Sequence, residues 1–273
     1  MEDKPQSPGA VRLIGARVIS GLTYAGGMAG LFGSTLRWAG RGLLTRKARF
    51  SGRALVAQMD RVGIRSLGIV VLVQVFIGVI LALQMTPPLA DYGQQGQVSR
   101  IIGVAGFRML GPIITAVVLS GFAGASIAAE LGTMVVAEEI EALEATALNP
   151  VRFLVVPRVL ATLIMMLLLT VVADLMIALG GWLTSRLALG PESYVGYWSR
   201  MQDQLRYRDF FTGLIQAAVF GVLVSLIACH EGLRVRGGAE GVGKATTMTV
   251  VYSIVAIVSA ACVFTMVFYV YEL

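Results

Sequence analysis

The chain has 273 residues, of which 56% are hydrophobic and only 14% charged. A soluble domain usually carries roughly a quarter charged residues, so this composition and a mean hydropathy of +0.78 exclude an ordinary soluble protein. The net charge of +6 does not indicate nucleic-acid binding, because the basic residues lie beside apolar segments and lack the interleaved aromatic residues of a base-stacking surface. Anionic lipid headgroups explain these residues better.

The N-terminal region, residues 1–62, alternates short apolar pieces with basic residues from Arg12 to Arg53. This pattern is typical of an amphipathic helix that lies in the headgroup plane of a membrane. A Gly-rich stretch at 26–33 leaves open a further span within residues 11–36. The acidic residues and prolines at the very start are unlike a signal peptide, so we expect no cleavage.

The remaining region, residues 63–273, is expected to form one membrane domain. It carries five apolar stretches, each near or above the roughly 20 residues that a transmembrane helix needs. They lie at about 67–89, 101–129, 159–183, 210–229 and 245–270. We therefore predict an all-α integral membrane protein with five transmembrane helices, preceded by the N-terminal interfacial amphipathic helix.

The distribution of basic residues predicts the orientation of the chain, because cytoplasmic loops retain Lys and Arg. With the N-terminus inside, the cytoplasmic side holds sixteen such residues and the other side five. We therefore expect a cytoplasmic N-terminus and an external C-terminus. The sequence shows no internal repeat that would support the inverted-repeat layout of many secondary transporters.

The second span contains an arginine, a proline and many small residues. Arg108 lies about 10 Å from the outer end of the span, so it either serves a headgroup or pathway role or snorkels outward. Pro112 removes a backbone donor and predicts a kink. Small residues four apart, such as Gly124 and Ala128, predict a close packing face, either within the chain or between subunits.

Two acidic residues lie near or within the hydrocarbon and are functional candidates by default. Glu130 is near the inner end of the second span, where we expect it to cap a helix or form an ion pair. Asp174 is near the middle of the third span and must be protonated, paired or facing a wet cavity. A structural polar contact is the slightly favoured interpretation for Asp174.

The loop between the second and third spans predicts a short amphipathic helix at about 136–148, which Asn149-Pro150 ends. Its acidic residues would be repelled by anionic lipid, so it is expected to face a basic groove on a partner protein. The alternative is a solvated acidic loop.

The sequence offers no convincing catalytic or metal site. The segment Gly238–Ala245 nearly matches a phosphate-binding loop but has Ala where Ser or Thr would hold magnesium. The single histidine, His230, has only Glu231 beside it and too few ligands for a metal. Both cysteines, Cys229 and Cys262, lie in apolar runs and indicate no disulfide framework. We expect a chain without catalytic residues, metal or cofactor of its own.

Several motifs together carry a resemblance to a known family. They are Arg108-x-Leu110-Gly111-Pro112, Gly121-x-Ala123-Gly124, Ala129-Glu130-Leu131-Gly132-Thr133-Met134, Glu138-Glu139-Ile140-Glu141-Ala142-Leu143, Asn149-Pro150 and Pro157-Arg158. With Leu83-Gln84 in the first span, they make the chain from about Gly63 to Val270 resemble the MlaE (YrbE) permease family. Members are the membrane subunits of ABC transporters that work with MCE proteins.

This resemblance implies a homodimer in a bacterial inner membrane that moves phospholipid or a related lipid between that membrane and an MCE protein. The expected mechanism is alternating access at the dimer interface, driven by a cytoplasmic ABC ATPase that binds the ATP and Mg. The chain itself would not be an enzyme. The resemblance implies that the acidic helix is the coupling helix, which docks on the ATPase through Glu138, Glu139, Ile140, Glu141, Leu143 and Glu144.

The resemblance also implies lipid-binding residues. Arg108 matches a family arginine close to the lipid pocket, and Met109 and Gln84 are the further substrate-binding candidates. Met109 replaces a glutamate of the family pattern, and Phe122 stands where an arginine is common. These departures affect charge-specific recognition of the headgroup.

Two functions of other classes remain open from the residues alone. An ion-coupled secondary transporter would use Asp174 and Glu130 without an ATPase. A non-transporting membrane scaffold would use the acidic helix only to recruit a partner.

Overall fold

The computed structural model describes residues 10–44 and 52–271, and nearly all of them are helical. Five helical segments are long and apolar enough to cross a membrane, which confirms the predicted number of spans. They are Gly52–Ala90, Gln95–Val136, Val151–Leu187, Tyr207–Leu233 and Gly238–Val270. Each is longer than its apolar run, because the helix continues into polar residues at one or both ends.

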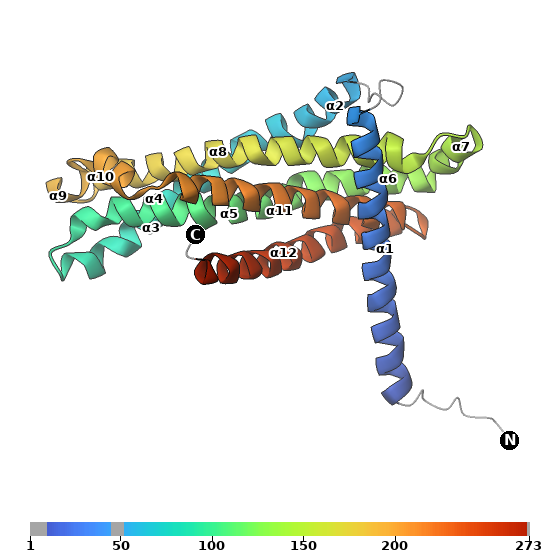
Figure 1. The fold of residues 1–273 in the computed structure, drawn as a ribbon, viewed down its shortest axis with the longest axis horizontal. Coiled ribbons are helices and arrows are strands. Elements are labelled where there is room, and N and C mark those ends of the chain that lie inside the picture. The colour runs from blue at the N-terminus through green and yellow to red at the C-terminus, as the bar shows by residue number, and fades with distance from the viewer. Residues whose placement is uncertain (1–9, 45–51, 272–273) are drawn as a thin grey trace.

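The helix bounds follow the chain order of Figure 1. They are α1 Ala10–Leu44, α2 Gly52–Met59, α3 Arg65–Ala90, α4 Val98–Ala105, α5 Gly111–Leu119, α6 Ala125–Val136, α7 Glu139–Ala145, α8 Val156–Leu187, α9 Pro191–Tyr194, α10 Tyr197–Gln204, α11 Tyr207–Leu233 and α12 Gly238–Val270. The spanning helices run side by side, with α7 at one end of the bundle and α9 and α10 at the other (Figure 1). We call these the α7 end and the α10 end.

Helix α1 crosses the bundle near the α7 end at a steep angle to the spans (Figure 1). It approaches α11 closely at Gly27, where a Cβ atom would lie 2.9 Å from His230. Further along, the guanidinium of Arg152 lies 5.4 Å from the ring of Trp38. Among the described helices, α1 is long but not apolar enough to count as a span. Its place in the headgroup plane stays a prediction.

The second span is not a continuous α-helix. Wide π-helical turns at Gly106–Leu110 and Ser120–Gly124 separate α4, α5 and α6. Pro112 lies in the first turn of α5, directly after the first of these turns, where a missing N–H is tolerated. Single π turns are an identifiable cause of helix bending and are frequent at functional sites.

Glycines allow the spans to approach at backbone distance. A Cβ atom on Gly78 of α3 would overlap the carbonyl oxygen of Ile177, and one on Gly180 of α8 would overlap that of Val75. On the second span, Gly124 faces Val224 of α11 and Thr249 of α12. The small-residue face at Gly124 therefore packs within the chain, a choice that the sequence had left open.

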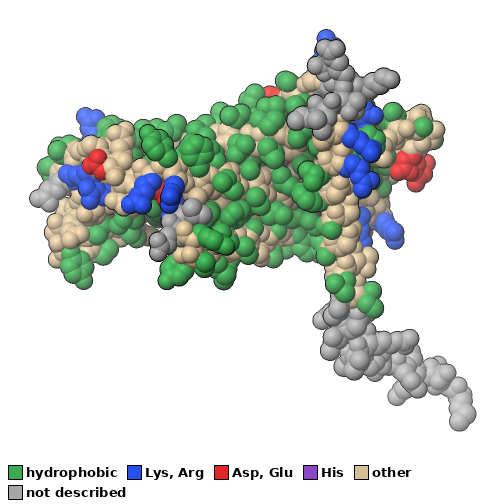
Figure 2. Space-filling model, in the orientation of Figure 1, with side chains coloured by type: hydrophobic (Ala, Val, Ile, Leu, Met, Phe, Trp, Pro, Cys, Tyr) green, Lys and Arg blue, Asp and Glu red, His purple; other side chains and the backbone are tan. Residues whose placement is uncertain are grey.

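The surface agrees with a membrane-spanning bundle. Hydrophobic side chains cover the middle of the bundle, and charged side chains gather toward its two ends (Figure 2). Exposed apolar residues are dense on α12, including Val255, Val258, Val263 and Met266. In water such a surface would be unfavourable, whereas in lipid or against another apolar subunit it is not.

Candidate functional site

The arginine of the second span is held in a defined position. Arg108 belongs to the π turn before α5, and its Nη1 lies 3.4 Å from Oδ1 of Asp209 at the start of α11. Its guanidinium also lies 5.4 Å from the ring centre of Phe268 on α12. The side chain is 31% exposed, so the cation is partly sheltered while remaining accessible to a ligand.

Asp209 links this arginine to the geometry of a helix start. Its other carboxylate oxygen, Oδ2, accepts a hydrogen bond of 3.0 Å from the backbone N–H of Arg206, which is part of a capping box at the beginning of α11. Because the carboxylate is fixed by the cap, the position of Arg108 is fixed as well. Asp209 was absent from the sequence-based candidates, although an acid three residues after an N-cap is a recognisable capping signal.

Arg108 and Met109 line an open cavity of about 590 Å³ between α4, α10, α11 and α12. The apolar part of its wall includes Val104 and Phe268. Its side chains with polar groups are those of Gln97, Arg100, Arg108, Gln204, Gln216, Thr265 and Tyr269. The cavity therefore combines cations with apolar surface, which is the chemistry of an amphipathic ligand site.

The third substrate-binding candidate lies elsewhere. Gln84 is exposed on α3, and no residue of α3 lines this cavity. The structure therefore brings together Arg108 and Met109 but not Gln84. Gln216 and Arg100, which the sequence did not single out, occupy the same wall instead.

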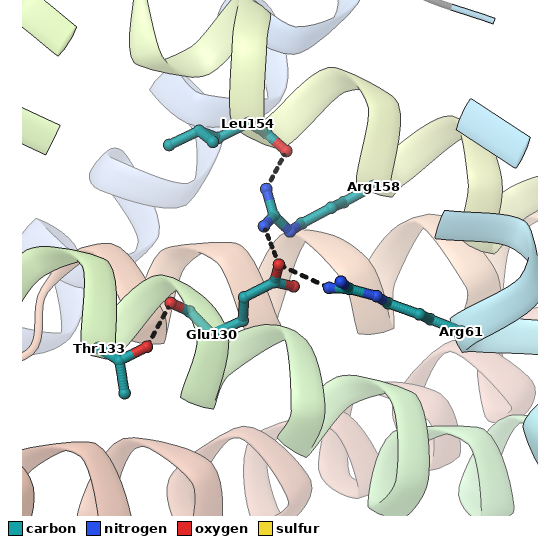
Figure 3. Close-up of polar contacts among 5 residues, drawn as sticks. All are labelled: Arg61, Glu130, Thr133, Leu154 and Arg158. Atoms are coloured by element: carbon teal, nitrogen blue, oxygen red, sulfur yellow. Dashed lines mark hydrogen bonds and ion pairs between the residues drawn. The ribbon is translucent and has the colours of Figure 1, made fainter. Parts of the chain in front are cut away.

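Glu130 has the ion pairs expected for it. Its Oε1 accepts a hydrogen bond from Arg61 at 2.8 Å and forms an ion pair with Nη2 of Arg158 at 3.1 Å (Figure 3). Arg158 also donates to the carbonyl oxygen of Leu154 at 2.8 Å and is almost fully buried. Arg61 belongs to a π-helical turn at Asp60–Ile64, directly before α3. One carboxylate on α6 therefore connects the start of α8 to this turn.

Asp174 lies inside the bundle, away from the cavity. It is 1% exposed, and a Cβ atom on Gly111 would overlap its Oδ1. Within residues 10–44 and 52–271, that oxygen has no hydrogen-bond partner. The Gln74 amide donates to Thr115 at 2.9 Å and to the Gly111 carbonyl at 3.3 Å. This polar contact joins α3 to α5, and Asp174 of α8 packs against Gly111 next to it.

The acidic helix after the second span forms, but it is shorter than predicted. Helix α7 covers Glu139–Ala145 rather than 136–148, because Glu138 and Ala147 adopt left-handed conformations, with φ of 59° and 58°. Ile140 and Leu143 are half-buried against the main core. Glu138, Glu139, Glu141 and Glu144 are exposed, and red side chains gather at the α7 end in Figure 2.

Comparison with known proteins decides the family. The model of the family described as Permease MlaE matches residues 55–267. The chain belongs to the MlaE permease family. It is therefore the permease subunit of an ABC transporter, with the helical spans that such a subunit requires.

Relatives of this MlaE-family chain come from different groups of organisms. A "Probable ABC transporter permease protein" of Rickettsia prowazekii is 34% identical over 79% of this chain and 83% of the relative. The "Intermembrane phospholipid transport system permease protein MlaE" of Haemophilus influenzae is 36% identical over 73% and 76%. The protein TRIGALACTOSYLDIACYLGLYCEROL 1 of Arabidopsis thaliana, a chloroplastic protein, is 31% identical over 77% and 60%.

The segment that nearly matches a phosphate-binding loop in this MlaE-family permease does not have the strand–loop–helix structure of such a loop. Helix α12 begins at Gly238, after Gly237 with a φ of 88°, and the described residues contain no strand that could precede such a loop. His230 contacts Arg234, with Nε2 and Nη1 3.1 Å apart. No group of three or more potential metal ligands occurs among the residues that the structure describes.

Proposed function

We propose that this chain moves phospholipid or a related lipid between a bacterial inner membrane and an MCE protein, as the membrane half of an ABC transporter. The observation that carries the proposal is the amphipathic cavity at Arg108, where Asp209 and the ring of Phe268 hold a partly sheltered guanidinium beside apolar wall. A phosphate group would bind the guanidinium, and acyl chains would lie against the apolar wall. The printed name of the Haemophilus influenzae relative supports this substrate.

The proposed assembly is a homodimer with a cytoplasmic ATPase and an MCE protein on the opposite side. The cavity is open, and α12, which forms part of its wall, has an exposed apolar face. A second copy packed on this face would close the cavity from the other side. The ATPase would bind the ATP and Mg, and this chain would contribute the cavity and the moving parts.

The proposed orientation places the α7 end in the cytoplasm together with the N-terminus. That end carries Arg61, Arg65, Arg152 and Arg158, and a second cavity there is lined by Arg234, Arg236 and Lys244. An excess of cations is expected on the cytoplasmic side. The α7 helix would then project toward the ATPase, with its acidic residues available for basic groups.

Movement of the ATPase would reach the spanning helices through the covalent and ionic connections of α7. Helix α7 follows α6 after a single tight turn at Glu138, so displacement of α7 displaces α6. Glu130 on α6 would pass that movement to α8 through Arg158 and toward α3 through Arg61. Alternating access then requires two arrangements of these helices with different lipid contacts.

No observation favours the ion-coupled alternative. A coupling carboxylate needs access to water in at least one state, and Asp174 is enclosed between α5 and α8. Glu130 is one-third exposed, but two arginines already form ion pairs with it. The scaffold alternative does not account for the cavity.

The proposal is tested by measuring how much phospholipid remains bound to the purified chain after detergent exchange. Arg108→Gln removes the cation and is expected to lower retention about tenfold, the effect of losing one charge-assisted contact. Arg186→Gln is the matched control, because Arg186 lies at the end of α8 against Trp182 and outside the cavity. Equal retention by the wild type and both variants would contradict the proposal.

A further inference from the structure

A second cavity lies at the α7 end, away from the cavity of the candidate functional site. It has a volume of about 540 Å³ and is lined by residues of α1, α11 and α12 and of the loop between the last two helices. Its wall carries three cations, from Arg234, Arg236 and Lys244, and one carboxylate, from Glu231. Among the described residues, none of these three cations forms an ion pair with a carboxylate. The cavity therefore has an excess of positive charge that the described part of the chain does not neutralise.

The loop that carries two of these cations is held against the bundle. Gly237 has a φ of 88° and turns the chain into α12. A Cβ atom on Gly241 would overlap the carbonyl oxygen of Arg236, so the loop folds back closely onto the first turns of this helix. Nη1 of Arg234 lies 3.1 Å from Nε2 of His230 on α11. The fold therefore sets the backbone position of one arginine and the side-chain position of the other.

The wall of the cavity changes from charged to apolar along α12. The lining residues extend from Gly241 to Tyr252, which lies about 16 Å further along the helix. Lys244 belongs to the charged part, whereas Met248 and Tyr252 belong to the apolar part. On the α1 side, the ring centre of Tyr24 lies 5.4 Å from that of Tyr252. Because tyrosines are enriched where a membrane protein meets the lipid headgroups, this pair indicates that the cavity lies at that level.

We propose that this cavity binds the phosphate group of an anionic phospholipid from the cytoplasmic leaflet, at a site separate from the transport cavity. Arginine and lysine bind phosphate through charge-assisted hydrogen bonds, and basic pockets at the cytoplasmic ends of spans bind acidic headgroups. The apolar wall beyond Lys244 would contact the first part of the acyl chains. This inference goes beyond the proposed function and takes from it only the orientation of the α7 end.

Other anions fit only part of this cavity. A soluble phosphate compound would bind the cations but would leave Met248 and Tyr252 without an apolar partner. An acidic segment of the ATPase would approach the end of the bundle, whereas the cavity continues for about 16 Å along α12 beside α1. A phospholipid offers a phosphate and apolar chains in one molecule, so it matches both parts of the wall.

The experiment maps where an anionic lipid lies on the full-length chain. A phosphatidylglycerol with a photoreactive group in its headgroup is mixed into phosphatidylcholine vesicles that contain the chain, and mass spectrometry identifies the labelled residues after illumination. We expect label between Arg234 and Met248. The double variant Arg236→Gln with Lys244→Gln should lower this label by about 10- to 30-fold, the effect of removing two cations from an acidic headgroup.

The matched control is Arg53→Gln with Arg65→Gln. It removes the same charge from exposed positions on α2 and α3 that lie outside the cavity, so it should keep the label. An unchanged label in the variant of Arg236 and Lys244 would overturn the inference. Label confined to the cavity at Arg108 would also overturn it, while leaving the proposed function intact.

Three further outcomes would overturn this lipid site. Loss of the label in millimolar inorganic phosphate, at an ionic strength held constant with chloride, would assign the cavity to a soluble phosphate compound. An unchanged label in the variant of Arg236 and Lys244, together with loss of the ABC ATPase from its complex purified from cells, would assign these cations to the ATPase. Absence of label anywhere on the wild-type chain would contradict both this inference and the proposed function.

Discussion

At the scale of single residues, the structure adds partners that the sequence could not supply. Arg108 and Glu130 were recognisable as candidates because charged residues are rare in spans. Asp209, which fixes Arg108, is 101 residues away in sequence, and Arg61 is 69 residues from Glu130. Ion pairs between residues so far apart leave no local pattern in the sequence, so only the three-dimensional structure reveals them.

The two arginines on Glu130 make unequal contributions to stability. The Arg158 side chain is 5% exposed and that of Arg61 is 51% exposed. Arg158→Met should lower the free energy of unfolding by about 1–3 kcal/mol, because it leaves buried polar groups without their partner. Arg61→Met should change it by less than about 1 kcal/mol, as for exposed ion pairs.

Denaturant unfolding in mixed micelles measures both variants. We expect Arg158→Met to lower the free energy of unfolding more than Arg61→Met does. A larger loss for Arg61→Met than for Arg158→Met would show that burial does not determine the strength of this network.

At the scale of helices, the apolar runs predicted which segments span but not where they bend or end. The runs fix the number of spans because backbone groups in lipid must be satisfied within each helix. The π turns at Gly106–Leu110 and Ser120–Gly124 have no comparable signal. Helix α7 is shorter than its amphipathic pattern because two residues adopt left-handed conformations, which the pattern does not report.

The close contact between α3 and α8 depends on glycines, whose lack of a Cβ atom lets the two backbones approach. Gly78→Ala would place a methyl group against the Ile177 carbonyl and should destabilise the protein by about 1–3 kcal/mol. Gly68→Ala on the same helix is the control, because no atom lies within 4 Å of its added Cβ. That change should be neutral or stabilising by up to about 1 kcal/mol. Thermal unfolding in detergent compares the two, and equal effects would argue against this close contact.

At the scale of the whole molecule, the cavity forms only because separate helices of the chain pack together. Its walls come from α4, α10, α11 and α12, and α4 is far in sequence from the other three. Of the predicted substrate contacts, Arg108 and Met109 lie in it and Gln84 does not. The family resemblance suggested a lipid pocket near Arg108 but not its other walls. The motif match did not predict the position of Gln84 correctly relative to this cavity, because a match in sequence does not show which face of α3 the residue occupies.

The central claim is that this chain, an ATPase and bound phospholipid form one transporter. We would crosslink cells of the native host, purify the tagged chain gently and identify the retained proteins and lipids by mass spectrometry. A variant combining Glu139→Lys and Glu141→Lys, two exposed positions on α7, serves as the comparison. We expect the wild type to retain an ABC ATPase, an MCE protein and phospholipid, and the variant to lose the ATPase but keep the phospholipid. Recovery of the wild-type chain alone, without ATPase or phospholipid, would contradict the account.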